Sequence, residues 1–323
     1  MMKRRLANIL RIIISLGLLT FLVYSNRGNF ADIAEASKSL NIYYLIIAFV
    51  SYFTAISFIV FRWGMLLRAH DIFISNRFLW QSALIGFFYN NLLPTSAGGD
   101  FYRVYDIKQN KGIPVNEGTA SVVVERVIGT LSSIILLIIA YFMGLFDYLT
   151  RNAALGVVIS GLVIILFFIA MFFPRLFKLN LLINKFRIFT KIRPGLKRFH
   201  VILISYRSKV KYLIISFMFT MVMQALFLMS YYFISLALGL ELRFYVFIFI
   251  IPFVSLVSSV PITIGGIGIR ENALVFAVTS FGIALGQATL FSIILLAIIL
   301  IIGMIGGIIY LFKNILYRSK SFI

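Results

Sequence analysis

Two short segments of this chain carry residue types that could bind an anionic group inside a membrane. Both fit the pattern P-x-[S/T]-x-G-G-x-x-x-R, the first from Pro94 to Arg103 and the second from Pro261 to Arg270. Proline and paired glycines interrupt a helix and free backbone N–H groups, and a guanidinium group binds phosphate through two parallel hydrogen bonds. The two copies begin 167 positions apart. Two interrupted segments at matching places predict a transport site between two repeats.

Other polar residues near the two motifs complete the set of candidate ligands. A charged side chain at membrane depth costs about 2.5–3.5 kcal/mol on insertion scales and usually faces a partner or a wet cavity. In the competing interpretation, the charged residues only pair with one another at the rim of the membrane. We expect a substrate-binding site formed by Asn91, Pro94, Thr95, Ser96, Gly98, Gly99, Asp100, Arg103, Glu125, Arg126, Pro261, Gly265, Gly266, Arg270 and Glu271.

Backbone and side chains have separate expected roles in this site. The N–H groups of the paired glycines are expected to donate to the same anion that Arg103 and Arg270 approach from opposite membrane faces. Asn90 is expected to satisfy either the broken backbone or the ligand. Tyr102 is either an interfacial anchor or a ligand contact. Arg62 is expected only to extend its head group toward water.

The composition excludes a soluble protein. Of 323 residues, 62% are hydrophobic and 12% are charged, and the mean hydropathy is +1.04. A bilayer hides that much apolar surface and a soluble domain does not, so we expect an all-α polytopic membrane protein. Cysteine is absent, and the two histidines, His70 and His200, lie far apart. We therefore expect no disulfide, no metal site and no cofactor.

The positive charge is concentrated in one loop. The net charge is +20, and the segment 174–211 holds eleven Lys or Arg residues and no Asp or Glu. Such a loop is typical of the cytoplasmic side of a membrane protein rather than of a nucleic-acid-binding surface. Apolar residues also recur there at helical spacing, at Leu176, Leu179, Ile183 and Phe186. They favour a surface helix that contacts anionic lipid head groups.

Hydropathy and loop charge together predict the topology. Candidate spans run over 6–24, 41–61, 119–143, 154–173, 212–238 and 288–312. We expect the protein to lie in the plasma membrane. Basic residues predict that both termini, the loop after the second span and the loop 174–211 face the cytoplasm. The segments 79–118 and 244–287 must then enter and leave on one side, as re-entrant helical hairpins. The alternative is eight spans, in which 244–262 and 272–286 both cross.

These elements divide the chain into two halves of opposite orientation. Residues 1–150 form a first repeat with the hairpin 79–118, and residues 151–323 form a second with the basic loop and the hairpin 244–287. The 167-residue offset maps 79–93 onto 246–260 and 119–143 onto 286–310, in agreement with the spans. An inverted-topology repeat of about six spans and two hairpins is typical of carriers that expose one site to alternate sides.

The motif residues also carry a resemblance to a known family. The run from Asn91 to Arg103, with Glu125, Arg126 and the segment from Pro261 to Glu271, resembles the flippase-like integral membrane family related to the transmembrane region of lysylphosphatidylglycerol synthase. The resemblance covers nearly the whole chain, and L-P-T-S-x-G-G-D-x-x-R is its most specific part. It implies translocation of a phospholipid or an isoprenoid-linked phospholipid. Because the chain ends at Ile323, without the soluble domain of the synthases, lysyltransferase activity is not expected.

Two function classes follow. The first is a flippase or scramblase that moves an anionic phospholipid or polyprenyl-phosphate-linked lipid between leaflets. The alternative is a membrane enzyme or accessory factor acting on a lipid-linked sugar or phosphate, with Asp100 and Glu125 as acid and base groups. The sequence has no metal-binding cluster and no nucleotide-binding loop, which disfavours the enzyme. An ion channel would need rings of carbonyls or charges that the sequence does not indicate.

Overall fold

Every element in the described part of the chain is a helix. The computed structural model describes residues 40–92, 98–151, 154–159, 161–162, 166, 193–258 and 268–320. Within these ranges it contains α-helices and short 3₁₀ turns and no strand, which confirms the all-α prediction. The predicted spans 6–24 and most of 154–173 lie outside the described residues.

Among the described residues, four helices are long and apolar enough to cross a membrane. They are α3 (Ile42–Arg68), α6 (Val115–Phe142), α10 (Val210–Ala237) and α13 (Leu285–Lys320). The shortest of them has 27 residues, or about 40 Å at a rise of 1.5 Å per residue, and the hydrocarbon core measures about 30 Å. The predicted spans 41–61, 119–143, 212–238 and 288–312 are thereby confirmed as long apolar helices.

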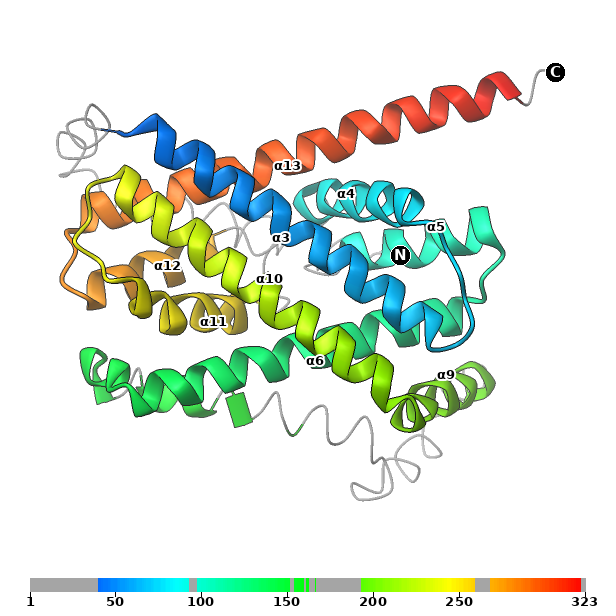
Figure 1. The fold of residues 1–323 in the computed structure, drawn as a ribbon, viewed down its shortest axis with the longest axis horizontal. Helices are drawn as coiled ribbons and strands as arrows, with labels where there is room; N and C mark the ends of the chain where they lie inside the picture. The colour runs from blue at the N-terminus through cyan, green and yellow to red at the C-terminus, as the bar shows by residue number, and fades with distance from the viewer. Residues whose placement is uncertain are drawn as a thin grey trace, which may run out of the picture.

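Helices α3 and α10 pack against each other in antiparallel orientation along most of their length (Figure 1). The backbone N–H of Asn41 at the start of α3 donates to the carbonyl of Ala237 at the end of α10, at 3.0 Å. Further along, Ser230 Oγ donates to the Ala48 carbonyl at 2.8 Å. Ser and Thr side chains that bond across helices in this way are typical of membrane helix pairs.

Four shorter helices form two pairs that lie at different places against the long ones (Figure 1). The first pair is α4 (Asn76–Leu92) and α5 (Gly98–Lys111), and α4 also packs against α13. The second pair is α11 (Phe247–Ser258) and α12 (Ile269–Ser280), and α11 also packs against α6. Each is shorter than the roughly 20 residues that a spanning helix needs. Helix α4 approaches α13 so closely that a Cβ atom at Gly306 would overlap the Leu84 carbonyl.

The remaining described elements are short connections. They are the 3₁₀ turns η1 (Leu145–Tyr148), η3 (Tyr206–Ser208) and η4 (Phe244–Val246) and the helix α9 (Arg193–Ser205). Helix α9 belongs to the basic loop and packs under α6, where Leu203 is fully buried. The residues of the predicted surface helix, Leu176, Leu179, Ile183 and Phe186, lie outside the described residues.

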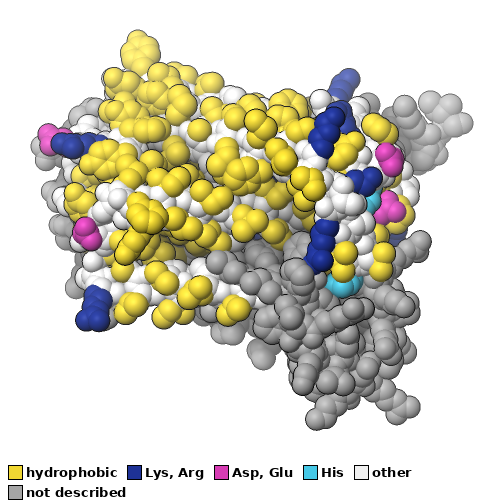
Figure 2. Space-filling model, turned by 60° about the horizontal axis from the view of Figure 1, so that its bottom comes forward, with side chains coloured by type: hydrophobic (Ala, Val, Ile, Leu, Met, Phe, Trp, Pro, Cys, Tyr) yellow, Lys and Arg dark blue, Asp and Glu magenta, His cyan; other side chains and the backbone are white. Residues whose placement is uncertain are grey.

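The surface has the apolar belt of a membrane protein. Figure 2 shows hydrophobic side chains over the middle of one face, with Lys, Arg, Asp and Glu side chains toward its two ends. Large apolar residues such as Val50, Ile138 and Met218, on three different long helices, are half exposed or more. Exposure on this scale is stable in lipid and not in water. The chain is a multi-pass membrane protein.

Candidate functional site

The first motif covers the connection from α4 to α5 and the first turns of α5. Residues 93–97, Pro94, Thr95 and Ser96 among them, lie outside the described residues. Helix α5 begins at Gly98, and Gly99 touches α4 so closely that a Cβ atom there would overlap the Gly86 carbonyl. The paired glycines therefore permit the close packing of α5 on α4.

The N–H group of Gly99 is already bonded. It donates to Asn90 Oδ1 at 2.6 Å, so Asn90 satisfies the broken backbone, and this N–H is not available to an anion as the sequence had suggested. Asn91 points elsewhere: its Nδ2 atom donates to the Ile299 carbonyl of α13 at 3.3 Å. Asn90 thus anchors the start of α5, and Asn91 joins α4 to α13.

Glu125 of α6 is the centre of a buried network of charges. Its Oε1 atom lies 2.6 Å from Nη2 of Arg62, and its Oε2 atom lies 2.7 Å from Nη2 of Arg103. These three residues are only 5–6% exposed. Asp100 continues the network, at 3.4 Å from Arg103 Nη1 and 2.6 Å from Arg126 Nε.

This network departs from simple pairing of sequence neighbours. Glu125 does not take Arg126 as its partner but binds Arg103, 22 positions away, and Arg62, 63 positions away. Arg126 instead reaches Asp100 from the partly exposed side. The buried members of the network are two guanidinium groups, of Arg62 and Arg103, and one carboxylate, of Glu125, which leaves one net positive charge among them. A buried excess charge is costly unless it has a counterpart, and an anionic ligand supplies one.

Arg62 is a site residue that the sequence analysis missed. The expectation that it extends to water is wrong, because its side chain is buried and bonds both Glu125 and, at 3.2 Å, Thr220 of α10. The signal was present in the spacing of α3. Arg62 falls on the helix face that also carries the buried residues Ala55 and Leu66, seven positions before it and four positions after it.

The charged network lines a cavity of about 210 Å³ between α3, α4, α5 and α6. Gly86, Gly99 and Asn90 contribute to its wall along with the five charged side chains. The Nε atoms of Arg62 and Arg103 are buried and have no hydrogen-bond partner among the described residues. Pockets for drug-sized ligands measure about 300–1,000 Å³. The cavity is therefore large enough only for a small group, and the guanidinium groups in its wall favour an anion.

The second motif builds a local cap and not a second copy of this network. Gly268 precedes α12 with a φ of 88°, and its N–H donates to Glu271 Oε2 at 2.6 Å. Arg270 donates two hydrogen bonds to the other oxygen of Glu271, Oε1, from Nε at 2.9 Å and from Nη2 at 2.6 Å. Here sequence neighbours do pair, as the competing interpretation held. Pro261, Gly265 and Gly266 lie outside the described residues.

Arg270 does not line the cavity that Arg103 lines. It lies close enough to Tyr52 of α3 and Tyr231 of α10 to interact with both electrostatically. Arg103 also approaches this helix pair: its guanidinium carbon lies 4.0 Å from the centre of the Trp63 ring of α3. Arg103 therefore lies against α3 at Trp63, whereas Arg270 lies near α3 and α10 at Tyr52 and Tyr231.

The chain's family is decided by a match that covers nearly all of these elements. The family model of the lysylphosphatidylglycerol synthase TM region matches residues 8–307. The chain belongs to this family. The match extends from before α3 into α13, so it includes both interrupted motifs and the charged network, and it confirms the resemblance seen in the motif residues.

Several archaeal proteins are similar to the chain. The UPF0104 membrane protein MJ1078 of Methanocaldococcus jannaschii is 29% identical over 196 residues, which cover 58% of this chain and 78% of the relative. Two UPF0104 membrane proteins of Methanothermobacter thermautotrophicus are 21% and 26% identical, each over 282 residues and about four-fifths of both chains. No solved structure matches the chain.

Proposed function

We propose that this protein is a lipid translocase, a flippase or scramblase that moves an anionic phospholipid or a polyprenyl-phosphate-linked lipid between the leaflets. The observation that carries the proposal is the cavity in which Arg62, Arg103 and Arg126 outnumber Glu125 and Asp100 by one charge. Guanidinium groups bind phosphate oxygens in a planar, two-point fashion. The head group enters this cavity while the acyl or prenyl tails stay in the bilayer.

The helix order supports an inverted repeat. The offset of 167 positions maps the start of α3, Ile42, to within one residue of the start of α10, and the start of α6, Val115, to within three residues of the start of α13. Related helices run in opposite directions in Figure 1, α3 against α10 and α6 against α13. A two-fold axis in the membrane plane produces this reversal. It allows one site to face alternate sides.

The positions of the two motif arginines support a path between them. Arg103 lies beside Arg62 through their shared partner Glu125, whereas Arg270 interacts with Tyr52 on the same helix. Arg62 and Tyr52 are ten residues apart on α3, which corresponds to about 15 Å along the helix axis. We infer that the head group moves along the α3–α10 pair from one arginine to the other, although the two do not share a cavity in this conformation.

The short helices support re-entrant hairpins over eight spans. Helices α11 and α12 have twelve residues each as described, too few to cross about 30 Å of hydrocarbon. Basic residues, among them Arg68, Arg77, Lys108 and Lys209, lie at the end of the molecule where α3 ends and α10 begins. We propose that this end faces the cytoplasm of a plasma membrane, with both chain termini, and that the loop 174–211 binds anionic lipid there.

The charged network favours a carrier over an enzyme. Glu125 binds a guanidinium group with each of its two oxygens, and Asp100 contacts Arg103 and Arg126. A general acid or base needs an oxygen that can reach the substrate, and guanidinium groups occupy both oxygens of Glu125 here. The described residues contain no group of three or more His, Asp or Glu side chains that could hold a metal ion.

Leaflet exchange in proteoliposomes tests the proposal. Fluorescent phosphatidylglycerol and phosphatidylcholine and a labelled polyprenyl phosphate are each reconstituted with the protein, and an impermeant reagent quenches the outer leaflet. We expect exchange of the anionic lipids, slowed about tenfold or more by Arg103→Lys, since loss of a two-point phosphate contact costs about 1.5–3 kcal/mol. Arg68→Lys, an exposed arginine of α3 outside the cavity, is the matched control.

Two results would contradict the proposal. Wild-type protein that is folded yet exchanges no lipid would favour the enzyme or accessory role. Equal exchange by Arg103→Lys and wild type would leave the cavity with a structural role only.

A further inference from the structure

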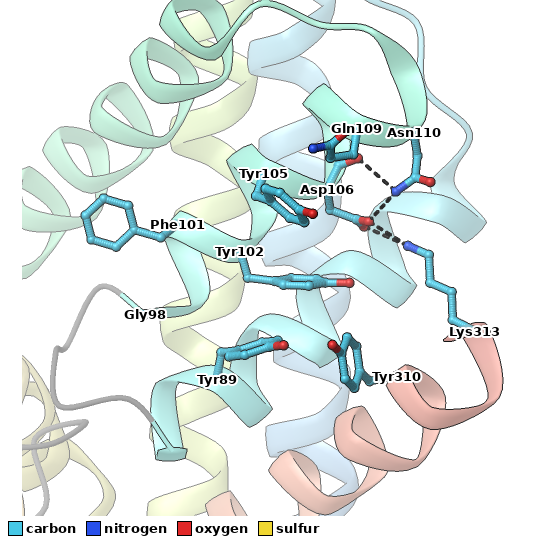
Figure 3. A pocket seen from close by; sticks show the side chains of 10 residues that line it. All are labelled: Tyr89, Gly98, Phe101, Tyr102, Tyr105, Asp106, Gln109, Asn110, Tyr310 and Lys313. Atoms are coloured by element: carbon cyan, nitrogen blue, oxygen red, sulfur yellow. Dashed lines mark hydrogen bonds and ion pairs between the residues drawn. The ribbon is translucent and has the colours of Figure 1, made fainter. Parts of the chain in front are cut away.

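A second, larger cavity lies on the other side of the first turns of α5. Its volume is about 630 Å³, and its wall comes from α4, α5 and α13 (Figure 3). Gly99, Asp100 and Arg103 line the charged cavity, whereas Gly98, Tyr102 and Tyr105 line this one. Helix α5 therefore separates two cavities of different chemistry, and the function proposed above uses only one of them.

Tyrosine side chains dominate the second cavity. The rings of Tyr89 and Tyr102 stack with their centres 4.8 Å apart, and Tyr310 of α13 meets them edge-on at 5.6 and 6.2 Å. Figure 3 shows the hydroxyl groups of these three residues directed toward one another across the cavity. Tyr105 adds a fourth ring, which is 57% exposed at the rim.

The charges in this cavity cancel. Lys313 Nζ lies 2.7 and 3.0 Å from the two carboxylate oxygens of Asp106, which also accepts a hydrogen bond of 2.8 Å from Asn110 Nδ2. The ammonium group has no excess charge for an anion, and the carboxylate has none for a cation. The other polar groups of the wall, the tyrosine hydroxyls and the Gln109 amide, are uncharged and both donate and accept.

This chemistry selects a neutral ligand with many hydroxyl groups. Each hydroxyl of a sugar donates one hydrogen bond and accepts others, as tyrosine hydroxyls and side-chain amides do. The C–H faces of a sugar ring also pack on aromatic rings, which supply most of the apolar wall here. A phosphate would find the ammonium of Lys313 already paired with Asp106, and an amine would find the carboxylate of Asp106 already paired with Lys313.

We propose that the tyrosine-lined cavity binds the sugar head group of a membrane glycolipid. Phe101 lines the cavity and is 68% exposed, and Leu92, at the end of α4 nearby, is 61% exposed. These apolar side chains offer a contact for the lipid chain beside the mouth of the cavity. Binding of the glycolipid does not depend on the proposed function. Its movement between the leaflets does.

Binding of three amphiphiles that share an octyl chain tests the proposal. The full-length protein is purified in a polyoxyethylene detergent, which carries neither sugar nor charge, and titrated with octyl glucoside, octyl phosphate and octyltrimethylammonium below their micellar concentrations. We expect octyl glucoside to bind at least about tenfold more tightly than the other two, a difference of about 1.4 kcal/mol. Equal binding of all three would show that only the chain is recognised and would overturn the proposal.

Variants of two exposed side chains at the rim test whether the ligand binds in this cavity. Tyr105→Ala and Gln109→Ala change exposed side chains of the rim, so they should fold normally, and each should weaken octyl glucoside binding by about fivefold or more. Tyr43→Ala, at a 75% exposed tyrosine of α3, is the matched control and should bind as wild type does. Unchanged affinity in both rim variants would overturn the assignment to this cavity.

A chain-free ligand separates a lipid from a soluble sugar. Methyl glucoside should bind much more weakly than octyl glucoside if the ligand is a lipid, and equal affinity would overturn the lipid part of the proposal. All of these titrations are made in detergent, where no leaflet exchange takes place. Loss of sugar binding and failure of lipid transport are therefore seen in different experiments.

Discussion

Arg103 Nη2 donates a 2.7 Å hydrogen bond to Glu125 Oε2, and this contact joins the first interrupted motif to the long helix α6. The same carboxylate binds Arg62 at 2.6 Å, so one buried Glu125 holds two guanidinium groups in place. The carboxylate fixes the positions of the arginines and leaves their Nε–H groups free of partners within the described part of the chain. It therefore organises the proposed head-group site.

Glu125→Gln should destabilise the protein strongly. The substitution keeps the side-chain volume but leaves Arg62 and Arg103 buried without their shared countercharge. Removing one partner of a buried ion pair costs about 3–5 kcal/mol. We expect a decrease of this size in the free energy of unfolding, measured by titration with dodecyl sulfate in mixed micelles.

Asp147→Asn is the control for that experiment, because Asp147 is exposed and its neutralisation should change the unfolding free energy by less than about 0.5 kcal/mol. A Glu125→Gln protein as stable as wild type would mean that water reaches this network freely.

Gly99→Ala should separate α5 from α4. A Cβ atom at this position would overlap the Gly86 carbonyl, which is backbone and cannot move aside cheaply. Overpacking of this kind costs about 1–3 kcal/mol. We expect a lower melting temperature and loss of lipid exchange, because displacement of α5 moves Arg103 away from Glu125.

Gly156→Ala is the matched control, since no described residue lies within 4 Å of a Cβ atom placed there. Alanine stabilises a helix relative to glycine by about 0.5–1 kcal/mol, so this variant should melt at the same temperature or higher. Normal melting and exchange in Gly99→Ala would contradict the close contact between the two helices.

The sequence predicted the long helices well because their signal is local. An apolar run of span length has one stable form in a bilayer, and α3, α6, α10 and α13 each fall where such a run was found. The interruption at Gly98 and Gly99 was also visible, because glycine pairs mark a break in any helix. Bounds and breaks follow from neighbouring residues alone.

The partners of the charged residues could not be predicted in the same way. The bond between Lys313 and Asp106 joins residues 207 positions apart and forms because α4 packs against both α5 and α13. Arg62 was misjudged because a lone arginine near the end of a span usually extends to water. Its burial depends on Glu125 and Thr220, which approach from two other helices. Contacts of this kind need the packed bundle.

Acidification should weaken the contact between His70 and α9. His70 follows α3, outside the spans; its Nε2 atom lies 3.3 Å from Ser205 Oγ and its ring packs on Tyr206. Burial lowers the pKa of His70 and is the largest effect; Glu117 opposes it, Lys209 lowers the pKa further, and Asp71 has the smallest, opposing effect. The neutral ring is thus favoured in the folded state.

The sign of the pH effect follows from this direction. The contribution of His70 to stability is complete above its unfolded pKa of about 6.5 and is lost as the pH falls through its lower folded value. The melting temperature should therefore decrease more between pH 7.5 and pH 5 in wild type than in His70→Gln, which does not titrate. Equal pH dependence in wild type and His70→Gln would contradict the prediction.

The two ends of the long helices should be accessible from opposite sides of the membrane. The chain has no cysteine, so a single introduced thiol reports its own position. Phe73, between α3 and α4, is 77% exposed at the basic end, and Glu241, between α10 and α11, is exposed at the other. The positive-inside rule predicts that the basic end faces the cytoplasm. An impermeant maleimide added to intact cells should label Glu241→Cys at once and Phe73→Cys only after permeabilisation.

Labelling of Phe73→Cys in intact cells, with Glu241→Cys protected, would reverse the proposed orientation, and labelling of both would contradict the assignment of α3 and α10 as spans.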